Sequence, residues 1–515
     1  MTARDSGGEV ADVGLVGDDD LGPLERLSPT LGAEWLEQQM LLPLGVADGR
    51  LRVATWGNAV DPLALDDLRL LLGRPVVLER RAEHAVRTAI RRVYGDDAQT
   101  ARDLITGLAG ESRERDADDV PLDDLLHLAN EAPVVRLVNL LLLEALEARA
   151  SDVHLEGYPD GLRVRYRVDG VLQDAPSPPA HLMAAVISRL KVMAELDIAE
   201  RRLPQDGRIR LALQRRQVDV RVSTLPTLRG ESVVLRLLDK ARGRIALDGI
   251  GMAPATVARF REVIGRPHGI VLATGPTGSG KTTTLYAAID AIRTGREKVL
   301  TVEDPVEYQL PGVPQVPVNE KAGVTFATAL RALLRQDPDV MLVGEIRDAE
   351  TAEIATQAAL TGHLVLSTLH TNDAATALTR LLDLGVAAYL VASTVDAVLA
   401  QRLVRVSCPA CRRPVPVAAA AARPGAELAE LGTDVEWRGV GCGECRHTGY
   451  RGRTGVYELL VMDDDLRGEV QRRRGSGELR GLAVARGMST LRQDGFRLVR
   501  EGVTTVEEVL RVARE

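Results

Sequence analysis

The second half of the chain alternates short apolar runs with stretches of helical spacing. The apolar runs cover residues 269–274, 298–302, 340–343 and 364–367. Apolar runs separated by helices are typical of a parallel β-sheet buried beneath helices. The pattern therefore predicts an α/β domain at residues 244–515.

Two earlier stretches predict strands because apolar and polar residues alternate strictly. Residues 162–168 and 218–222 place every second side chain on one face, which indicates half-buried strands. An amphipathic stretch at 132–150 precedes them and predicts a long helix. These features together predict a second α/β module at residues 121–243.

A smaller α+β module is predicted at residues 24–95, where strand-like and helix-like stretches alternate. The segments on either side of it have few large apolar residues. Residues 1–23 are polar and rich in Gly and Asp, so we predict a disordered tail. Residues 96–120 are acidic and predict a linker. The whole chain is thus predicted to be an α/β multidomain protein.

Composition narrows the range of functions. The 515 residues exceed what a single small module needs. Lys and Arg number 65 against 73 Asp and Glu, a net charge of −8, which argues against a simple nucleic-acid binder. Aromatic residues make up only 3%, which disfavours stacking on single-stranded bases. We expect no direct contact with nucleic acid.

The N-terminal residues do not resemble a secretory signal, because they lack a basic start and an apolar stretch. No window contains about 18 consecutive apolar residues, the length that a membrane-spanning helix needs. We expect a cytoplasmic protein that meets a membrane only through partners.

A phosphate-binding loop follows the first apolar run. Its sequence fits G-x-x-x-x-G-K-[ST], between a predicted strand and a predicted helix. Glycines let backbone N–H groups point at phosphate oxygens, the lysine reaches the β- and γ-phosphates, and the final hydroxyl holds Mg²⁺. ATP and Mg²⁺ are the predicted ligands of Gly275, Pro276, Thr277, Gly278, Ser279, Gly280, Lys281 and Thr282.

Two predicted strands end in carboxylates. Glu345 follows residues 340–343, with Gly344 at the position where many such enzymes have Asp, and Glu303 ends the run at 298–302. Glu307 lies a few residues further on. Carboxyl ends of parallel strands share one edge of the sheet, so these acids are expected near the nucleotide. A helix cap or a surface ion pair is the alternative for each.

Two histidines flank the predicted strand that begins at residue 364. His363 precedes this strand and His370 follows it. Either could sense or position the γ-phosphate, and a structural role for each remains open.

Several arginines could stabilise charge on a transferring phosphoryl group. Arg208 and Arg221 lie in the second module, and Arg331 and Arg335 are one helical turn apart in the third. Ordinary surface ion pairing is the alternative for any one of them.

All four cysteines occur in two C-x-x-C pairs. Each pair presents two thiolates, and two pairs complete a tetrahedral four-sulfur site for Zn²⁺. A site with four protein ligands has no open position, so its role is predicted to be structural. The proposed ligands are Cys408, Cys411, Cys442 and Cys445.

Residues 334–348 resemble the signature of the secretion ATPases, the hexameric motors of type II secretion and type IV pilus assembly. The resemblance extends over about residues 120–515 and includes the stretches at 151–156, 165–170, 203–208, 301–308 and 362–373. It implies a RecA-like ATPase core, a preceding PAS-like domain and a zinc-binding insertion at about 405–450.

The resemblance also implies roles for individual residues. It makes Glu345 the Walker B acid and Glu303 of the Asp box a candidate general base. Arg208 and Arg221 match arginines that reach the nucleotide from the preceding domain. Arg331, Arg335 and Arg453 match arginines that line the site.

The four cysteines are typical of assembly members rather than retraction members of this family. The N-terminal module is similar to one that docks on a membrane partner, although binding of a cyclic dinucleotide remains open. The implied function is a cytoplasmic motor of type II secretion, a homohexamer associated with the inner membrane through platform proteins. A type IV pilus or DNA-uptake motor, a nucleotide-gated scaffold with little turnover and a nucleic-acid remodeller are the alternatives.

Overall fold

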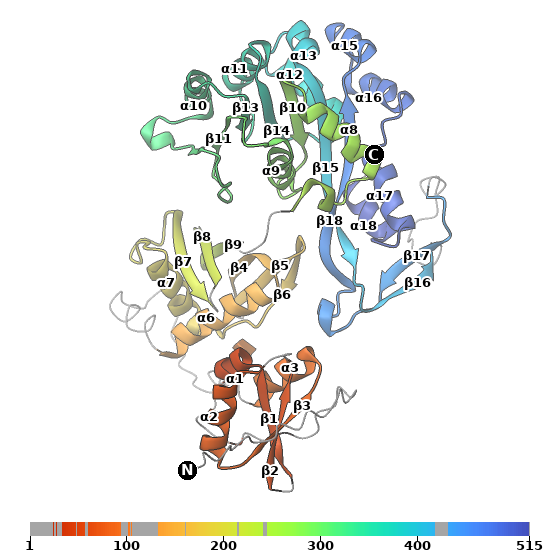
Figure 1. The fold of residues 1–515 in the computed structure, drawn as a ribbon. Helices are drawn as coiled ribbons and strands as arrows, with labels where there is room; N and C mark the ends of the chain where they lie inside the picture. Colours follow the sequence, from red (N-terminus) through yellow and green to blue (C-terminus); the bar gives the residue numbers. More distant parts are fainter. Residues whose placement is uncertain are drawn as a thin grey trace, which may run out of the picture.

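The computed structural model describes most of the chain, in several stretches. The predicted tail at 1–23 and most of the predicted linker at 96–120 lie outside them, so those two predictions stay untested. Three units, each with its own main sheet, follow one another along the chain (Figure 1). The described residues are 24, 27, 33–47, 49–56, 60–93, 101–102, 105, 132–159, 161–213, 216–239, 245–417 and 431–513.

The first unit is a three-stranded sheet with helices packed on it. Strand β2 pairs antiparallel with β1 and parallel with β3. Leu, Val, Ile and Ala side chains fill its core. Its elements are α1 (Ala33–Gln39), β1 (Leu41–Ala47), β2 (Arg50–Thr55), α2 (Pro62–Leu72), β3 (Val76–Arg80) and α3 (Glu83–Val93).

The second unit is a six-stranded antiparallel sheet in the order β6-β5-β4-β9-β8-β7. Helices α6 and α7 pack on one face, where alternate strand residues are buried. The opposite face carries mostly polar and charged side chains, and we call it the open face. The elements are α6 (Ala132–Glu147), β4 (Ala150–Tyr158), β5 (Gly161–Val168), β6 (Val171–Asp174), α7 (Met183–Met193), β7 (Gln205–Leu213), β8 (Arg216–Thr227) and β9 (Gly230–Asp239).

The third unit is built on a seven-stranded sheet in the order β12-β11-β13-β14-β10-β15-β18. Its strands are parallel except for β18, which pairs antiparallel with β15. The predicted parallel sheet is therefore present, with an antiparallel edge that the sequence pattern did not indicate. The strands are β10 (Gly269–Thr274), β11 (Val299–Glu303), β12 (Gln315–Pro317), β13 (Val340–Val343), β14 (Leu364–Leu369), β15 (Val395–Ser407) and β18 (Tyr450–Val461).

Helices cover both faces of this sheet, so β10 and β14 are buried throughout. Helices α8 and α9 cover one face, and α10 to α13 cover the other. This burial on both sides explains why these strands read as continuous apolar runs. The helices are α8 (Pro254–Ile264), α9 (Lys281–Ile292), α10 (Phe326–Leu333), α11 (Ala349–Leu360), α12 (Ala374–Asp383) and α13 (Ala388–Thr394).

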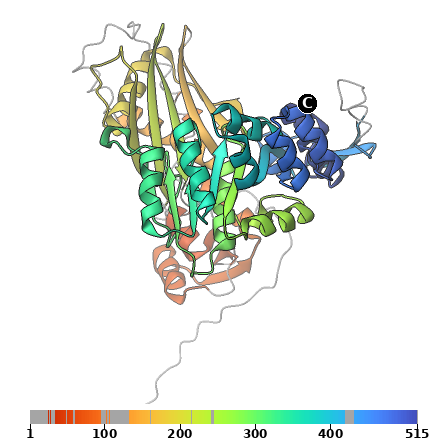
Figure 2. The ribbon, with the colours of Figure 1, turned by 90° about the horizontal axis from the view of Figure 1, so that it is seen from above.

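The cysteines lie in an excursion between β15 and β18. A two-stranded hairpin, β16 (Arg412–Pro416) and β17 (Val435–Gly439), belongs to it. Figure 2 shows the C-terminal helices and this hairpin to one side of the main sheet. Within the described residues, no helix is long and apolar enough to cross a membrane. The C-terminal helices are α15 (Asp464–Gln471), α16 (Ser476–Ala485), α17 (Leu491–Arg500) and α18 (Val506–Val512).

Candidate nucleotide site and zinc centre

The glycine-rich loop joins β10 to α9 at the carboxyl edge of the sheet. Gly275, Gly278 and Gly280 have φ angles of +150°, +77° and +89°, which L side chains rarely adopt. A Cβ atom at Gly275 would lie 2.5 Å from the carbonyl oxygen of Gln401, and one at Gly280 would lie 2.8 Å from its Nε2. Both positions therefore require glycine, as a phosphate-cradling loop does.

The polar groups of this loop fit a nucleotide. Lys281 Nζ donates to the carbonyl oxygens of Gly275, at 2.7 Å, and Pro276, at 3.2 Å. Burial lowers the pKa of Lys281 to about 8, and the nearby Glu345 charge limits the decrease. Ser279 Oγ is buried and has no hydrogen-bond partner among the described residues. An unpartnered hydroxyl and a partly desolvated ammonium group are both stabilised by a bound phosphate chain.

Glu345 follows β13 and lies between two basic side chains. Its carboxylate pairs with the guanidinium of Arg347 and lies 3.3 Å from His370 Nε2. Strands β10 and β13 both pair in parallel with β14 and end at the same edge of the sheet, so the loop and Glu345 follow strand ends at that edge. The charge of Glu345 accordingly raises the pKa of Lys281, against the effect of burial. Thr368 Oγ1 donates to the Gly344 carbonyl at 2.7 Å and so fixes the turn that carries Glu345. The predicted neighbourhood of loop and acid is present.

The glycine before Glu345 has a steric reason. A Cβ atom at Gly344 would lie 3.2 Å from the ring of Phe326 and 3.3 Å from the Cα of Glu303. A side chain at this position, such as the aspartate that many P-loop enzymes carry, would require the Phe326 ring or β11 to shift by a few tenths of an ångström. In this chain the carboxylate stands on the following residue, Glu345.

Glu303 ends β11 at the same edge, but its carboxylate is surrounded by neutral donors. Tyr286 donates its hydroxyl to Oε2, while Thr301 Oγ1 and Gln315 Nε2 donate to Oε1 at 2.6 and 3.0 Å. The residue is 3% exposed. Although the strand end is where the sequence predicted it, the carboxylate is directed at side chains of α9 and β12. Its role as general base stays a prediction.

The structure separates the two histidines. His370 lies beside Glu345. His363 precedes β14 and lies beside Gly269, where β10 begins; its Nδ1 contacts the carbonyl oxygen of Ala358 at 2.9 Å. Because the strand between them has six residues, His363 lies at the opposite edge of the sheet, about 20 Å of strand away. The expected contribution of His363 to the phosphate site is therefore not supported.

The arginines also separate into groups. Arg208 and Arg221 lie side by side on the open face of the second unit. Arg331 pairs with Glu350 at 2.7 Å, and Arg335 Nη1 donates to the Arg331 carbonyl at 3.0 Å, so both have local partners on the surface.

Arg453 lies 3.6 Å from Asp169 of the second unit. Asp169 also accepts the backbone N–H of Gly452 at 2.8 Å. Arg453 thus contributes to a contact between units.

Gln401 and Arg402, two polar residues of β15, lie near the loop. Neither of them was identified from the sequence. The side-chain oxygen of Gln401 accepts from Thr284 Oγ1 at 2.8 Å. Arg402 is buried and donates to the carbonyl oxygen of Asn372 at 2.7 Å. The sequence does mark these two positions, because Gln401 and Arg402 interrupt an otherwise apolar run. Tyr286 and Gln315, the donors to Glu303, gave no such signal.

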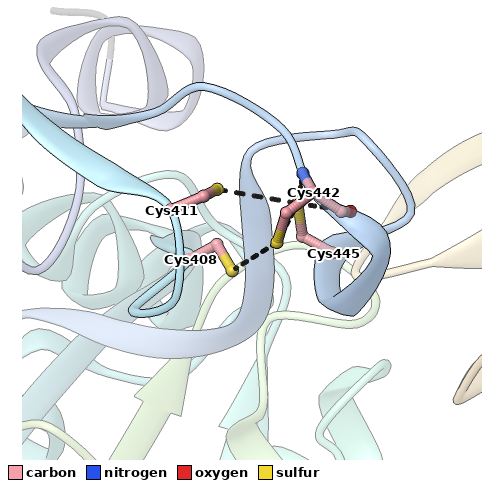
Figure 3. Close-up of side chains that lie close together, drawn as sticks. All are labelled: Cys408, Cys411, Cys442 and Cys445. Atoms are coloured by element: carbon pink, nitrogen blue, oxygen red, sulfur yellow. Dashed lines mark hydrogen bonds between the residues drawn. The ribbon is translucent and has the colours of Figure 1, made fainter. Parts of the chain in front are cut away.

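The four cysteines converge from two knuckles that face each other (Figure 3). Their sulfur atoms all lie within 4.8 Å of one another, with separations of 3.9 Å for the pairs Cys408–Cys442 and Cys411–Cys445. Tetrahedral zinc, with Zn–S bonds of about 2.3 Å, requires sulfurs about 3.8 Å apart. The donor set and spacing therefore fit Zn²⁺.

A glycine loop between a buried strand and a helix, with an acid at the same edge of the parallel sheet, after a strand one place removed, defines the class of P-loop ATPases. The chain belongs to the type II/IV secretion system protein family, whose model matches residues 127–511. A second model, the MshEN domain, matches residues 11–100. The predicted family, fold class and ATP hydrolase activity are confirmed.

Relatives and solved structures agree with this assignment. The chain is 51% identical to type II secretion system protein E of Pseudomonas aeruginosa, over 88% of this chain and 91% of that protein. It is 44% identical to the type IV pilus assembly ATPase PilB of Myxococcus xanthus, over 93% of this chain and 85% of that protein. The Legionella pneumophila ATPase DotB shares the fold, with a TM-score of 0.54 and 22% identity over 73% of this chain and 94% of that one.

Proposed function

We propose that this chain is the cytoplasmic motor of a type II secretion system, which hydrolyses ATP to drive pseudopilus assembly and protein export. The observation that carries the proposal is the complete phosphate loop with Lys281 beside Glu345, within a family of secretion ATPases. Several relatives that are 47–51% identical are type II secretion proteins, while the pilus-assembly relative is 44% identical.

The proposed chemistry assigns a task to each residue. Backbone N–H groups of the loop and Lys281 hold the β- and γ-phosphates, and Thr282 holds Mg²⁺, which would neutralise developing charge. Glu345 polarises the attacking water from the end of β13, which is separated from the loop strand β10 by β14. His370 lies near enough to Glu345 to orient it. Arg208 and Arg221 contact the phosphate chain from the second unit.

Phosphate release by the purified full chain tests the proposal. Lys281→Ala removes the charge that binds the phosphates, so turnover is expected to fall to background. Low basal activity is expected without the membrane partner, so a second set of reactions includes it. Normal turnover in Lys281→Ala would refute the proposal. Nucleotide binding without turnover, even with the partner, would favour the scaffold alternative.

The pilus-assembly alternative rests on the similarity to the Myxococcus protein. The two motors differ in the genes that accompany them. A secretin gene with minor pseudopilin genes nearby supports secretion, whereas a pilin gene with a retraction ATPase gene supports a pilus.

We also propose that Cys408, Cys411, Cys442 and Cys445 bind one structural Zn²⁺. The thiolate distances support this assignment. Elemental analysis of the purified chain should give one zinc per chain. Cys408→Ser with Cys442→Ser should remove it and lower the thermal midpoint, because a structural metal contributes directly to folding. Full metal content in the double variant would contradict the assignment.

The remaining proposals concern assembly and organisation. We propose a homohexamer that associates with inner-membrane platform proteins and meets the membrane only through them. We also propose the divisions at residues 24–95, 96–120, 121–243 and 244–515, with the zinc insertion at about 405–450. The separate main sheets of the three units support the proposal for the described residues. Analytical ultracentrifugation with nucleotide tests the hexamer.

A further inference from the structure

The open face of the second unit carries a row of charged residues that runs straight across five strands. Strand pairing places Arg208 opposite Arg221, and Arg221 opposite Arg236. The row continues through Asp152 to Arg167. The first three members are all arginines on adjacent strands. Like charges directly opposite each other destabilise a sheet, so this arrangement needs a compensating reason.

Asp152 is the single carboxylate in this row. Two arginines of the row contact it, and the hydroxyl of Ser151 donates to its Oδ2 at 2.8 Å. Arg236 Nε lies 3.1 Å from Asp152 Oδ1, and Arg167 Nε lies 3.9 Å from Oδ2. The carboxylate is 8% exposed, so little room remains around it. Asp152 is therefore saturated from two sides.

Arg208 and Arg221 are left without such a partner. Within the described residues, neither side chain makes a hydrogen bond or an ion pair. Together with Arg236 they line a hollow of about 530 Å³. Burial lowers the pKa of Arg221, and the charges of Arg208 and Arg236 act in the same direction, opposed by Glu307 and Asp304 of the ATPase domain. Acidic side chains therefore lie near this end of the row, Asp206 in the lining of the hollow and Glu307 and Asp304 across from it, but none of them forms an ion pair with Arg208 or Arg221 in the described residues.

Resting on the proposed function, we propose that Arg236 is a positioning residue, which occupies Asp152 so that Arg221 stays free to bind the phosphate chain of ATP. Arg221 and Asp152 lie on strands separated only by β9, about 10 Å apart. A long arginine side chain can span that distance. Without Arg236, Asp152 would attract Arg221 away from the nucleotide.

This mechanism predicts that a second substitution restores the activity that a first one removes. A double-mutant cycle, measured as ATP turnover by the full chain, tests this. Arg236→Gln should lower kcat about tenfold, because Arg221 turns to Asp152. Adding Asp152→Asn removes the competing carboxylate, so the double variant should recover to within about threefold of the parent. Arg236→Lys keeps a cation at Asp152 and should retain most of the activity.

A matched control lies on the same face outside the row. Arg163 of β5 lies opposite Glu156 of β4. Its guanidinium carbon lies 4.8 Å from the centre of the Tyr158 ring. Arg163→Gln should leave kcat and KM unchanged. Thermal midpoints of all variants separate a folding defect from a positioning defect, because a folding defect lowers the midpoint and is not reversed by Asp152→Asn.

The phosphate chain could belong to ATP on the same chain or on a neighbouring copy. Co-assembly of Arg221→Gln chains with Lys281→Ala chains distinguishes the two sources. Regained turnover means that the arginine acts on the neighbour's nucleotide. Absence of regained turnover means that it acts within its own chain.

Two results would overturn the inference. Turnover of Arg236→Gln equal to that of the Arg163→Gln control would show that Arg236 does not matter. A slow Arg236→Gln enzyme that Asp152→Asn fails to restore would make Arg236 a direct phosphate contact or a structural residue. Failure of the proposed function itself is distinguishable, because Lys281→Ala would then hydrolyse ATP normally.

Discussion

Two carboxylates at neighbouring strand ends, Glu303 after β11 and Glu345 after β13, have opposite surroundings. Glu345 contacts two basic side chains, Arg347 and His370. Glu303 is held by hydroxyl and amide donors and has no basic partner among the described residues. An acid that must respond to charge on a nucleotide benefits from mobile ionic partners. An acid fixed by three neutral donors also holds the surrounding elements together.

The largest expected effect of changing either acid alone comes from Glu345→Gln. Loss of the carboxylate removes both the polarisation of water and the ionic contacts with its basic neighbours. We expect kcat for ATP hydrolysis to fall by about 10²–10⁴-fold, with little change in the thermal midpoint, since the partners of Glu345 are partly exposed. A large decrease in the midpoint would mean that Glu345, too, is a packing residue.

Glu303→Gln should lower activity and stability together. In either orientation the NH₂ group of the new amide faces a group that now donates, either Tyr286 at the position of Oε2 or Thr301 and Gln315 at the position of Oε1. A buried N–H group that faces other donors and finds no acceptor lowers the free energy of unfolding by about 1–3 kcal/mol. We expect a thermal midpoint several degrees lower and at least a tenfold loss of turnover. Loss of turnover at an unchanged midpoint would instead favour Glu303 as the general base.

Tyr286→Phe should have a smaller effect of the same kind. It removes one of the three donors to Glu303 and leaves the ring in place against Tyr308, 4.7 Å away. The expected cost in stability is about 1–2 kcal/mol, with a twofold to fivefold decrease in kcat on the order expected for a lost positioning contact. Tyr308→Phe is the matched control, because it removes a hydroxyl from the other ring of the pair while the hydrogen bond from Tyr286 to Glu303 stays in place. Equal effects of both changes would show that the hydrogen bond donated to Glu303 contributes no more than the loss of the other hydroxyl of the pair.

The sequence predicted those parts of the site that lie in contiguous motifs. The loop and Glu345 could be located because a strand, a turn and a chemical group follow one another along the chain. The cysteines could be paired because each knuckle is local. Glu303 was located correctly, but its donors were not, because Tyr286 and Gln315 reach it only through the packing of α9 and β12 against β11.

Strand pairing and strand direction explain what else was missed. His363 and His370 look equivalent in sequence, yet a strand of six residues places them at opposite edges of the sheet. The row that contains Arg236 depends on the register of strands far apart in the chain. Single-sequence patterns indicate which residues share a face, but they do not indicate which residues are opposite each other.

A further prediction concerns the pH dependence of nucleotide binding. Lys281 binds phosphate in its charged form, and its pKa of about 8 in the free protein rises when the phosphate chain binds. Binding therefore takes up a proton above pH 8, and affinity for ATP should fall as pH rises through that value, by at most about tenfold per pH unit. A fluorescent ATP analogue titrated between about pH 6.5 and 9.5 measures the midpoint.

The two acids should differ in this titration. Glu345 is among the charges that act on Lys281 and raises its pKa, whereas Glu303 is not. Glu345→Gln should therefore move the midpoint to lower pH, and Glu303→Gln should leave it unchanged. The midpoint is independent of any uniform loss of affinity, so it reports on charge rather than on packing. If the pH midpoint moved by the same amount in both variants, both carboxylates would act on the charge of Lys281. The two acids would then differ only in how they are packed.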